Sequence, residues 1–356
     1  MKKAMIAMSG GVDSSVAAKL MQDRGFACVG CTMKLYGNGE AGLERGHTCC
    51  ALEDVEDARS VACRLHIPYY VFNYTREFKS EVMERFVCAY ASGVTPNPCI
   101  DCNRYMKFRR LLDRALVLGC DCLATGHYAR IGFDGERYVL KKSIDESKDQ
   151  SYVLYFLTQS QLSRLCFPLG DMTKTQVRRI AAENGFINAG KADSQDICFV
   201  PDGDYAAFIE RYTGKACPEG DFVDAQGKVM GRHRGVTHYT VGQRRGLGAA
   251  FGKAMYVKSI QPRENTVTLC ENGALFSTTL TAGDFHWISG KRPEGEVRCR
   301  AKIRYRQTEQ DAVAIPLEDG TVRIVFDSPQ RAVTPGQAAV LYEGDVVLGG
   351  GVILKT

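Results

Sequence analysis

The stretch Ser9-Gly10-Gly11-Val12-Asp13-Ser14-Ser15 decides the fold of this chain. The apolar segment 4–8 precedes it and a helical pattern follows, which predicts a strand, a glycine turn and the start of a helix. Such a turn presents backbone N–H groups and the positive end of the helix dipole to a phosphate. The glycines allow close approach of an anion, the serines add hydroxyl donors, and Asp13 could hold Mg²⁺ against the phosphates.

The sequence beyond this stretch alternates between predicted strands and predicted helices up to about residue 200. We expect strands at 4–8, 27–33, 69–73 and 122–125, and helices at 15–24, 53–65, 76–91 and 106–118. A further helix has clear boundary signals, with Thr173 as N-cap, Gln176 three residues later and Gly185 after its end. This alternation predicts a parallel α/β sheet with its ligand site at the carboxyl ends of the strands, where the glycine loop lies.

The pattern changes past residue 205. One predicted helix, 205–212, is followed by short β-like segments at 254–260, 266–270, 322–326 and 338–341, separated by turn residues. This spacing is typical of small β-domains or a barrel. We therefore expect an α/β domain at 1–204, a small central β-rich domain at 205–272 and a C-terminal β-barrel-like domain at 273–356, with the second boundary placed at Asn272-Gly273.

Charge and composition restrict the class of partner and the compartment. The net charge is +5, but residues 225–263 hold eight Lys/Arg and no acidic residue, and a second basic run covers 298–306. Such clusters favour a polyanion larger than a nucleotide, although a solvated basic face is the alternative. The apolar N-terminal run is too short for a signal peptide, and no run is long enough for a membrane span. We therefore expect a cytoplasmic protein whose 15 cysteines are mostly reduced.

Among these cysteines, the spacing distinguishes packing from chemistry. Cys28 and Cys31 lie three apart in a predicted strand, so they point to opposite faces and are expected in the core. Cys99 and Cys102 follow two prolines, in a loop or at a helix start, where a thiol has a lowered pKa. Cys198 lies where a polar stretch turns apolar, and by itself would be read as a buried strand cysteine. The adjacent Cys49 and Cys50 could be redox-active or metal-binding, but an ordinary loop is the preferred interpretation.

The glycine loop lacks the Gly-x-x-x-x-Gly-Lys-Ser/Thr spacing of the P-loop. Its order, Ser-Gly-Gly-x-Asp-Ser, resembles the PP-loop of the ATP pyrophosphatases, which cleave ATP between the α- and β-phosphates and adenylate a substrate. Nearly the whole chain resembles the bacterial and mitochondrial tRNA-specific 2-thiouridylases. The stretches that carry this resemblance are 7–15, 95–98, 102–103, 107–108, 124–128, 148–152, 193–194, 197–199, 242–244, 304–308 and 334–337.

The resemblance implies a sulfurtransferase with a Rossmann-like PP-loop domain. Enzymes of this family use ATP and Mg²⁺ to adenylate the C2 oxygen of uridine 34 in tRNAs for Lys, Glu and Gln, and a protein persulfide replaces that oxygen with sulfur. The implied partners are therefore tRNA and a cysteine desulfurase or sulfur-carrier protein.

The resemblance also implies roles for individual residues of this sequence. Cys102 matches the nucleophile and Cys198 the persulfide cysteine, and the two are expected to form a disulfide as sulfur is released. The implied ATP-binding residues are Ala7, Met8, Ser9, Gly10, Gly11, Val12, Asp13, Ser14, Met33 and Gly126. Those implied to contact the target base or the tRNA are Asn97, Pro98, Cys99, His127, Lys148, Asp149, Gln150, Tyr305, Arg306 and Gln337.

One departure from the family pattern leaves alternatives open. Many relatives carry Asp, a candidate acid/base group, at the position of Cys99. The thiol here puts that role in doubt, and Cys99, Cys102 and Cys198 could instead hold a [4Fe–4S] cluster. Two other readings are a small-molecule ATP pyrophosphatase or ligase, and a non-catalytic tRNA-binding or redox-sensing protein that has kept the fold. The first leaves the Cys102/Cys198 pair unexplained, and the second predicts damage in the PP-loop that the sequence does not show.

Overall fold

The computed structural model describes residues 1–37, 52–193 and 197–355, so Cys49, Cys50 and Ser194 lie outside the described residues. The N-terminal sheet is parallel throughout, in the order β3-β2-β1-β4-β7. Its strands are β1 (Lys3–Ala7), β2 (Ala27–Lys34), β3 (Tyr69–Asn73), β4 (Cys122–Thr125) and β7 (Leu165–Cys166). The predicted parallel α/β sheet is confirmed. The winding direction reverses between β1 and β4, the place where a parallel sheet opens a ligand site.

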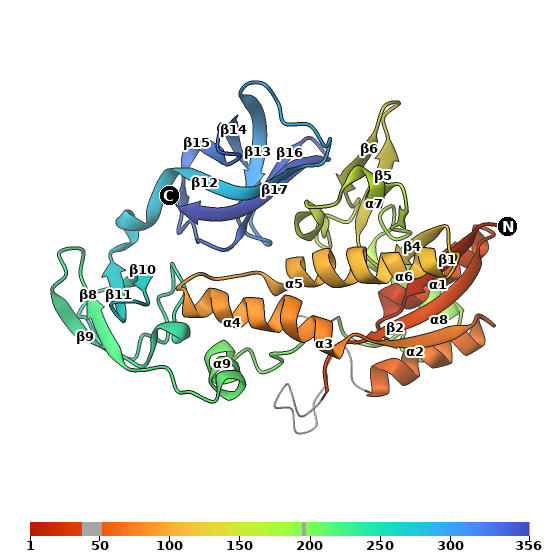
Figure 1. Ribbon diagram of the computed structural model, residues 1–356, viewed down its shortest axis with the longest axis horizontal. Coiled ribbons are helices and arrows are strands. Elements are labelled where there is room, and N and C mark those ends of the chain that lie inside the picture. Colours follow the sequence, from red (N-terminus) through yellow and green to blue (C-terminus); the bar gives the residue numbers. More distant parts are fainter. Residues whose placement is uncertain (38–51, 194–196, 356) are drawn as a thin grey trace.

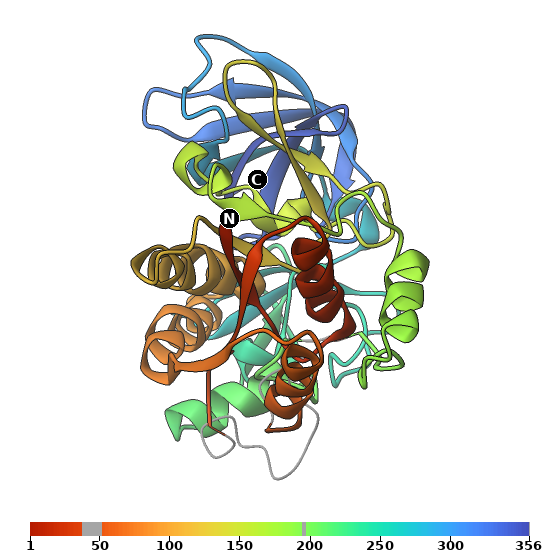
Figure 2. The same cartoon turned by 90° about the vertical axis from the view of Figure 1, so that its right-hand side faces the viewer.

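Helices cover both faces of this sheet (Figure 2). One face packs against α1 (Val12–Asp23), α2 (Leu52–Arg64) and α8 (Lys174–Glu183). The other packs against two long helical segments, 75–91 and 98–117. Side chains along β2 alternate between the two faces of the sheet. Cys28 is buried on the face covered by α1, α2 and α8, and Cys31 is buried on the face covered by the two long helical segments. The prediction that these two cysteines are core residues on opposite faces is confirmed.

Two helix boundaries differ from the prediction. The segment expected from Met106 begins at Pro98, as α5 (Pro98–Asp101), the π-helical η2 (Cys102–Leu111) and α6 (Leu112–Val117). Asn97 caps it by accepting a hydrogen bond from the Cys99 N–H at 3.2 Å, and proline at the first helical position is a standard start signal. Helix α1 begins at Val12 rather than Ser15. The preceding long segment consists of α3 (Thr75–Phe78), η1 (Lys79–Met83) and α4 (Glu84–Ala91).

The C-terminal half contains two β-structures (Figure 1). The central sheet has the order β10-β11-β8-β9 and follows helix α9 (Tyr205–Thr213). The C-terminal sheet has the order β12-β15-β14-β13-β16-β17, and a further pairing of β12 with β17 closes it into the predicted barrel. The strands are β8 (Gly220–Val223), β9 (Val229–His233), β10 (Tyr256–Gln261), β11 (Thr266–Cys270), β12 (Phe276–Trp287), β13 (Val297–Lys302), β14 (Gln310–Pro316), β15 (Val322–Arg331), β16 (Ala338–Glu343) and β17 (Val346–Lys355).

A hairpin from the N-terminal region joins the barrel sheet. Strands β5 (Ala129–Phe133) and β6 (Tyr138–Lys142) pair with each other, and β6 reaches β17 through Val346 and Lys141. The sequence reading did not include this hairpin. It means that the first and third predicted domains share a sheet, and the division at 204/205 and 272/273 stays a prediction.

The barrel also touches the start of the 98–117 helical segment. Thr95 N–H donates to the Pro335 carbonyl at 3.0 Å, and the Gln337 side-chain amide donates to the Thr95 carbonyl at 2.9 Å. Gly336 has φ +90°, and a Cβ there would lie 2.2 Å from Val94 Cγ1. The loop leading to Cys99 and Cys102 is therefore fixed in place by residues 335–337.

Gly336→Ala tests this contact. The substitution adds a methyl group where the Val94 side chain and the Thr95 carbonyl leave no room, on a backbone that alanine disfavours. We expect the free energy of unfolding to fall by about 2–4 kcal/mol in chemical denaturation, combining αL strain with overpacking. Gly344→Ala is the matched control, because Gly344 has φ +58° but open space around its Cβ position. It should cost only the strain, about 1–2 kcal/mol, and equal destabilisation of both variants would contradict the contact.

Candidate nucleotide and thiol site

The predicted phosphate loop joins β1 to α1 and is shaped by its own hydroxyl groups. Ser14 Oγ accepts from the Ser9 N–H at 3.1 Å and donates to the Gly11 carbonyl at 3.0 Å. Within the described part of the chain, no side chain caps α1 at Gly11, so the first backbone N–H groups of the helix remain for an anion. The other residues matched to ATP binding are close to this loop in the fold, since Ala7 ends β1, Met33 is buried in β2 and Gly126 directly follows β4.

Close backbone packing holds the loop. A Cβ on Gly10 would lie 2.4 Å from the Asp54 carbonyl oxygen, and one on Gly126 would lie 2.8 Å from Asp13 C and Ser14 N. Asn188, only 3% exposed, donates through Nδ2 to the Gly10 carbonyl at 2.8 Å and to Ser15 Oγ at 2.9 Å. Asn188 is a loop-supporting residue that the sequence reading missed, because nothing in its local pattern connects it with residues 10–15.

Asp13 is held by two side chains from other elements. The Tyr128 hydroxyl donates to Asp13 Oδ1 at 2.7 Å, and Lys174 Nζ lies 2.7 Å from Oδ1 and 2.8 Å from Oδ2. Burial and the neighbouring Asp13 carboxylate raise the pKa of Tyr128, so this phenol stays protonated as a donor. Both oxygens that could coordinate Mg²⁺ therefore contact Lys174 in this structure, and the predicted Mg²⁺ role of Asp13 stays a prediction.

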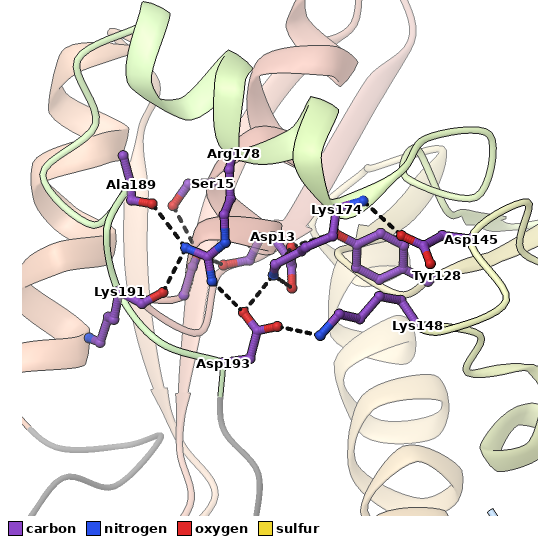
Figure 3. A network of polar contacts seen from close by, with 12 residues as sticks. Asp13, Ser15, Tyr128, Asp145, Lys148, Lys174, Arg178, Ala189, Lys191 and Asp193 are labelled. Atoms are coloured by element: carbon purple, nitrogen blue, oxygen red, sulfur yellow. Dashed lines mark hydrogen bonds and ion pairs between the residues drawn. The ribbon is translucent and has the colours of Figure 1, made fainter. Parts of the chain in front are cut away.

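A cluster of cations extends from Asp13 to Asp193 (Figure 3). Lys174 Nζ also lies 2.7 Å from Asp193 Oδ1, which Arg178 contacts at 3.0 Å, and Lys148 lies 2.8 Å from Asp193 Oδ2. Burial would raise the pKa of Asp193, but the hydrogen bonds from Lys148 and Lys174 outweigh it and lower that pKa. These three cations thus converge with two carboxylates beside the phosphate loop, a charge balance suited to receive phosphate groups.

Lys174 and Arg178 were also missed as site residues, although their helix was predicted. Thr173 forms the expected capping box with Gln176, so α8 begins at Lys174. Residues four apart share one face of a helix, which explains why Lys174 and Arg178 both reach Asp193. The four-residue spacing therefore indicated that Lys174 and Arg178 share one face of the helix. Only the packing of α8 against α1 directs that face toward the phosphate loop.

The two candidate cysteines pack on one hydrophobic core. Cys102 begins η2 and Cys198 lies in a turn, and both are partly exposed and border the same buried cluster. The Tyr36 hydroxyl, just beyond β2, donates to the Cys198 carbonyl at 2.6 Å. Phe199 is 1% exposed and packs edge-on against Phe78 and Phe86. Cys198 is therefore not a buried strand residue, and its neighbours fix it at the carboxyl end of the sheet.

Cys99 and its surroundings lie on the exposed side of the same helix start. The Cys99 side chain is exposed. The pKa of Tyr305 is raised mainly by burial of its hydroxyl and, to a smaller extent, by the nearby Asp149 and Cys99. Tyr305 is 37% exposed and its ring lies 5.9 Å from that of Tyr152. Burial also raises the pKa of Asp101, between the two cysteines, to about 6. Cys99 and Tyr305, distant in the sequence, are thus near enough in the fold for their charges to interact.

The remaining residues matched to tRNA contact have mostly internal partners. His127 is 7% exposed, and its ring contacts those of Phe108 and Phe167. Burial, and to a smaller extent the positive charge of Lys107, lowers the pKa of His127 well below its usual value. Asp149 accepts from the Ser143 and Ser151 N–H groups, and Gln150 accepts from the Tyr128 N–H. Arg306 is exposed. A tRNA contact by these residues stays a prediction.

The described residues form no site for a single metal ion. Across residues 1–37, 52–193 and 197–355, no three His, Cys, Asp or Glu side chains are placed to share a metal ion. Cluster ligands lie farther apart than the ligands of a single ion, so the iron–sulfur alternative for Cys99, Cys102 and Cys198 stays a prediction. In the same described ranges, every helix is too short or too polar to cross a membrane.

Comparison with known proteins covers the whole chain. Residues 2–202 match the tRNA methyl transferase HUP domain, 206–271 the tRNA methyl transferase PRC-barrel domain, and 277–353 the aminomethyltransferase β-barrel domain. The chain is 52% identical over 356 residues to the tRNA-specific 2-thiouridylase MnmA of Acetivibrio thermocellus, covering 99% of both proteins. It is 49% identical to that of Lachnoclostridium phytofermentans and 48% identical to that of Clostridioides difficile, each over at least 99% of both chains.

Asn188→Ala tests the support of the loop. It leaves the buried Gly10 carbonyl without its side-chain donor, so we expect a decrease of about 1–3 kcal/mol in the free energy of unfolding. ATP binding measured by calorimetry should weaken as well, because the loop backbone is less well positioned. Asn184→Ala is the control, since the Asn184 side chain makes a local hydrogen bond to the Ile180 carbonyl of α8. If the two variants bind ATP equally well, Asn188 does not support the loop.

Proposed function

Because the chain belongs to the family of tRNA-specific 2-thiouridylases, we propose that it is a tRNA sulfurtransferase that replaces the C2 oxygen of uridine 34 with sulfur. The observation that carries the proposal is the similarity over all three domains, since a small-molecule ATP ligase would need only the first. An intact phosphate loop argues against a protein without catalytic activity.

The first step proposed is adenylation. The C2 oxygen of uracil attacks the α-phosphorus of ATP, and pyrophosphate leaves. A carbonyl oxygen is a poor leaving group, whereas AMP is a good one. In this proposal the backbone N–H groups at the start of α1 and the ammonium of Lys174, which lies beside Asp13, stabilise the negative charge on the departing pyrophosphate. Mg²⁺, when bound, would supply further charge neutralisation, with Asp13 as the proposed protein ligand.

The second step proposed is sulfur transfer by Cys198 and Cys102. The terminal sulfur of a persulfide on Cys198 attacks C2, and AMP leaves. The Cys102 thiolate then attacks Cys198 Sγ, which breaks the persulfide S–S bond, leaves the sulfur on C2 and forms the Cys102–Cys198 disulfide. An external dithiol must reduce this disulfide, and a cysteine desulfurase or sulfur carrier must supply the next persulfide.

The tRNA is proposed to lie across the barrel, the central domain and the loop at Asn97. Arg244 and Arg245 are exposed in the central domain, and Arg306 is exposed beside Tyr305. The second basic run is less available than its sequence indicated, because Arg298 pairs with Asp327 and Arg304 donates inward to the Ala332 carbonyl. The tRNAs for Lys, Glu and Gln are the proposed substrates, and the cytoplasm the proposed compartment.

The deciding experiment is a thiolation assay. Purified protein, ATP, Mg²⁺ and a persulfide donor are incubated with unmodified tRNA(Lys), and 2-thiouridine is detected by mass spectrometry of the digested RNA. Product that depends on ATP supports the proposal. Adenylation of a free amino acid without any reaction on tRNA would favour the small-molecule ligase instead.

Cys99→Ala separates the persulfide relay from a cluster mechanism. In the relay only Cys102 and Cys198 are essential, so the kcat of each alanine variant should fall roughly a thousandfold, as expected for a missing covalent group. Cys99→Ala should keep activity within about threefold, like Cys88→Ala on the neighbouring exposed surface of α4, because neither change removes a reacting group. The measurement is anaerobic thiolation together with iron analysis, and joint loss of iron and activity in Cys99→Ala would overturn the relay.

Arg244→Gln, Arg245→Gln and Arg306→Gln test the RNA surface. Each should weaken tRNA binding, and removing one phosphate contact should reduce the slope of log K against log salt by about 0.7–0.9. Filter binding at several salt concentrations measures both quantities. Arg298→Gln is the control, because its charge is already neutralised by Asp327. Unchanged affinity and slope in all three variants would make these arginines a solvated face.

A further inference from the structure

The helix that begins at Cys102 repeats every five residues. Its segment η2 is π-helical, so its backbone hydrogen bonds join residues five apart rather than four apart. The burial of its side chains follows the same spacing, because Asn103 and Phe108 are 2% and 0% exposed and Met106 and Leu111 are both 0% exposed. Side chains five positions apart in this segment therefore share one face of the helix.

Lys107 lies five residues after Cys102 and so occupies the same face. Both side chains are half-buried. In an α-helix, two residues five apart would point about 140° away from each other. The π-helical geometry, which is frequent at functional sites, is therefore what turns the Lys107 cation to the side of the helix that carries the Cys102 thiol.

Lys107 also lies close to the end of β4 that packs on the phosphate loop. The ring centroid of the next residue, Phe108, is 5.4 Å from that of His127, and the charge of Lys107 contributes to the low pKa of His127. His127 directly follows Gly126, which packs against the Asp13–Ser14 peptide. The ammonium of Lys107 thus lies on the side of its helix that faces the start of α1.

Lys107 differs from the other cations beside the loop in its charge balance. Lys148, Lys174 and Arg178 each contact the carboxylate of Asp193. Within residues 1–37, 52–193 and 197–355, Lys107 takes part in no ion pair. A phosphate can therefore pair with Lys107 without competing against a carboxylate of the described chain, whereas the other three cations must exchange one partner for another.

We propose that Lys107 is a further catalytic residue whose ammonium pairs with the α-phosphate of the adenylated uridine. The inference rests on the proposed function, in which this phosphate joins the uracil to AMP between the cysteines and the phosphate loop. In the sulfur-transfer step the C2–S bond forms and the C2–O bond breaks. The oxygen leaves with the bonding electron pair as part of AMP, whose phosphate gains one negative charge. Lys107 stabilises that charge and transfers no proton.

The first test measures binding of AMP and of adenosine to the full-length protein by calorimetry. Lys107→Met removes the charge and keeps an unbranched side chain. The ratio of the adenosine dissociation constant to that of AMP isolates the contribution of the phosphate. We expect this ratio to fall about tenfold in Lys107→Met, as for the loss of one charge-assisted contact. Adenosine binding should stay the same, and Lys107→Arg should keep the ratio within about threefold of the wild type.

The second test measures 2-thiouridine formation in a single turnover with unmodified tRNA(Lys). Lys107→Met should lower the rate about a hundredfold, as expected when one preorganised group that stabilises developing charge is removed. Lys107→Arg should restore the rate to within about tenfold of the wild type. Arg110→Met is the matched control, because Arg110 is an exposed cation on the same helix. It should leave both the AMP/adenosine ratio and the rate unchanged.

A measurement on the wild-type protein decides the question even if Lys107→Met fails to fold. Acetylated Lys107 resists trypsin, so the modified protein yields a peptide of residues 105–109 that mass spectrometry can quantify. At an AMP concentration ten times its dissociation constant, acetylation of Lys107 should slow about tenfold, since only the free protein then reacts. Adenosine at the same occupancy should protect Lys107 much less, because it lacks the phosphate.

Three results would overturn the inference: acetylation of wild-type Lys107 that ignores bound AMP, an unchanged AMP/adenosine ratio in Lys107→Met, or an equal loss of that ratio in Arg110→Met. Thiolation of tRNA at the wild-type rate by Lys107→Met would reject this inference alone. A wild-type protein that neither binds AMP nor thiolates tRNA would reject the proposed function, and the inference with it.

Discussion

The contact on which the site depends is the backbone packing around the start of α1. Gly10 lies against the Asp54 carbonyl and Gly126 against the Asp13–Ser14 peptide, both closer than any side chain would permit. This packing brings the end of β4 and the start of α2 to the phosphate loop. Asn188 then closes the loop from a third direction. The backbone N–H groups of α1 are therefore preorganised, and an anion can bind without rearrangement of the loop.

Charged side chains of both signs lie beside this loop. Lys174, Arg178 and Lys148 are partly buried and are balanced by the carboxylates of Asp13 and Asp193. A buried cation needs a partner, and a carboxylate that serves as partner can exchange for a phosphate. The same residues therefore balance one another's charge in this structure and are candidates to receive phosphate groups. Lys191 makes a parallel contact to Asp54 and Asp57, and these acids outweigh the effect of burial and raise its pKa.

The barrel contributes to the site through position rather than through reacting groups. Residues 335–337 hold the loop at Thr95, and Tyr305 lies near Cys99. The β5–β6 hairpin continues the barrel sheet from within the N-terminal region. These contacts fix the loop that leads to Cys99 and Cys102 against the barrel.

The sequence by itself determined the parallel α/β domain, the phosphate loop, the capped helix at Lys174 and the opposite-facing Cys28 and Cys31, because each follows from local periodicity or a turn signal. It also singled out Cys102 and Cys198 through family resemblance. Only the tertiary structure decided which distant side chains meet: Asn188 with Gly10, Lys174 with both Asp13 and Asp193, and Gln337 with Thr95. It also showed His127 and Arg304 turned inward. Spacing along the chain fixes which face a residue occupies, whereas its partner depends on how separate elements pack.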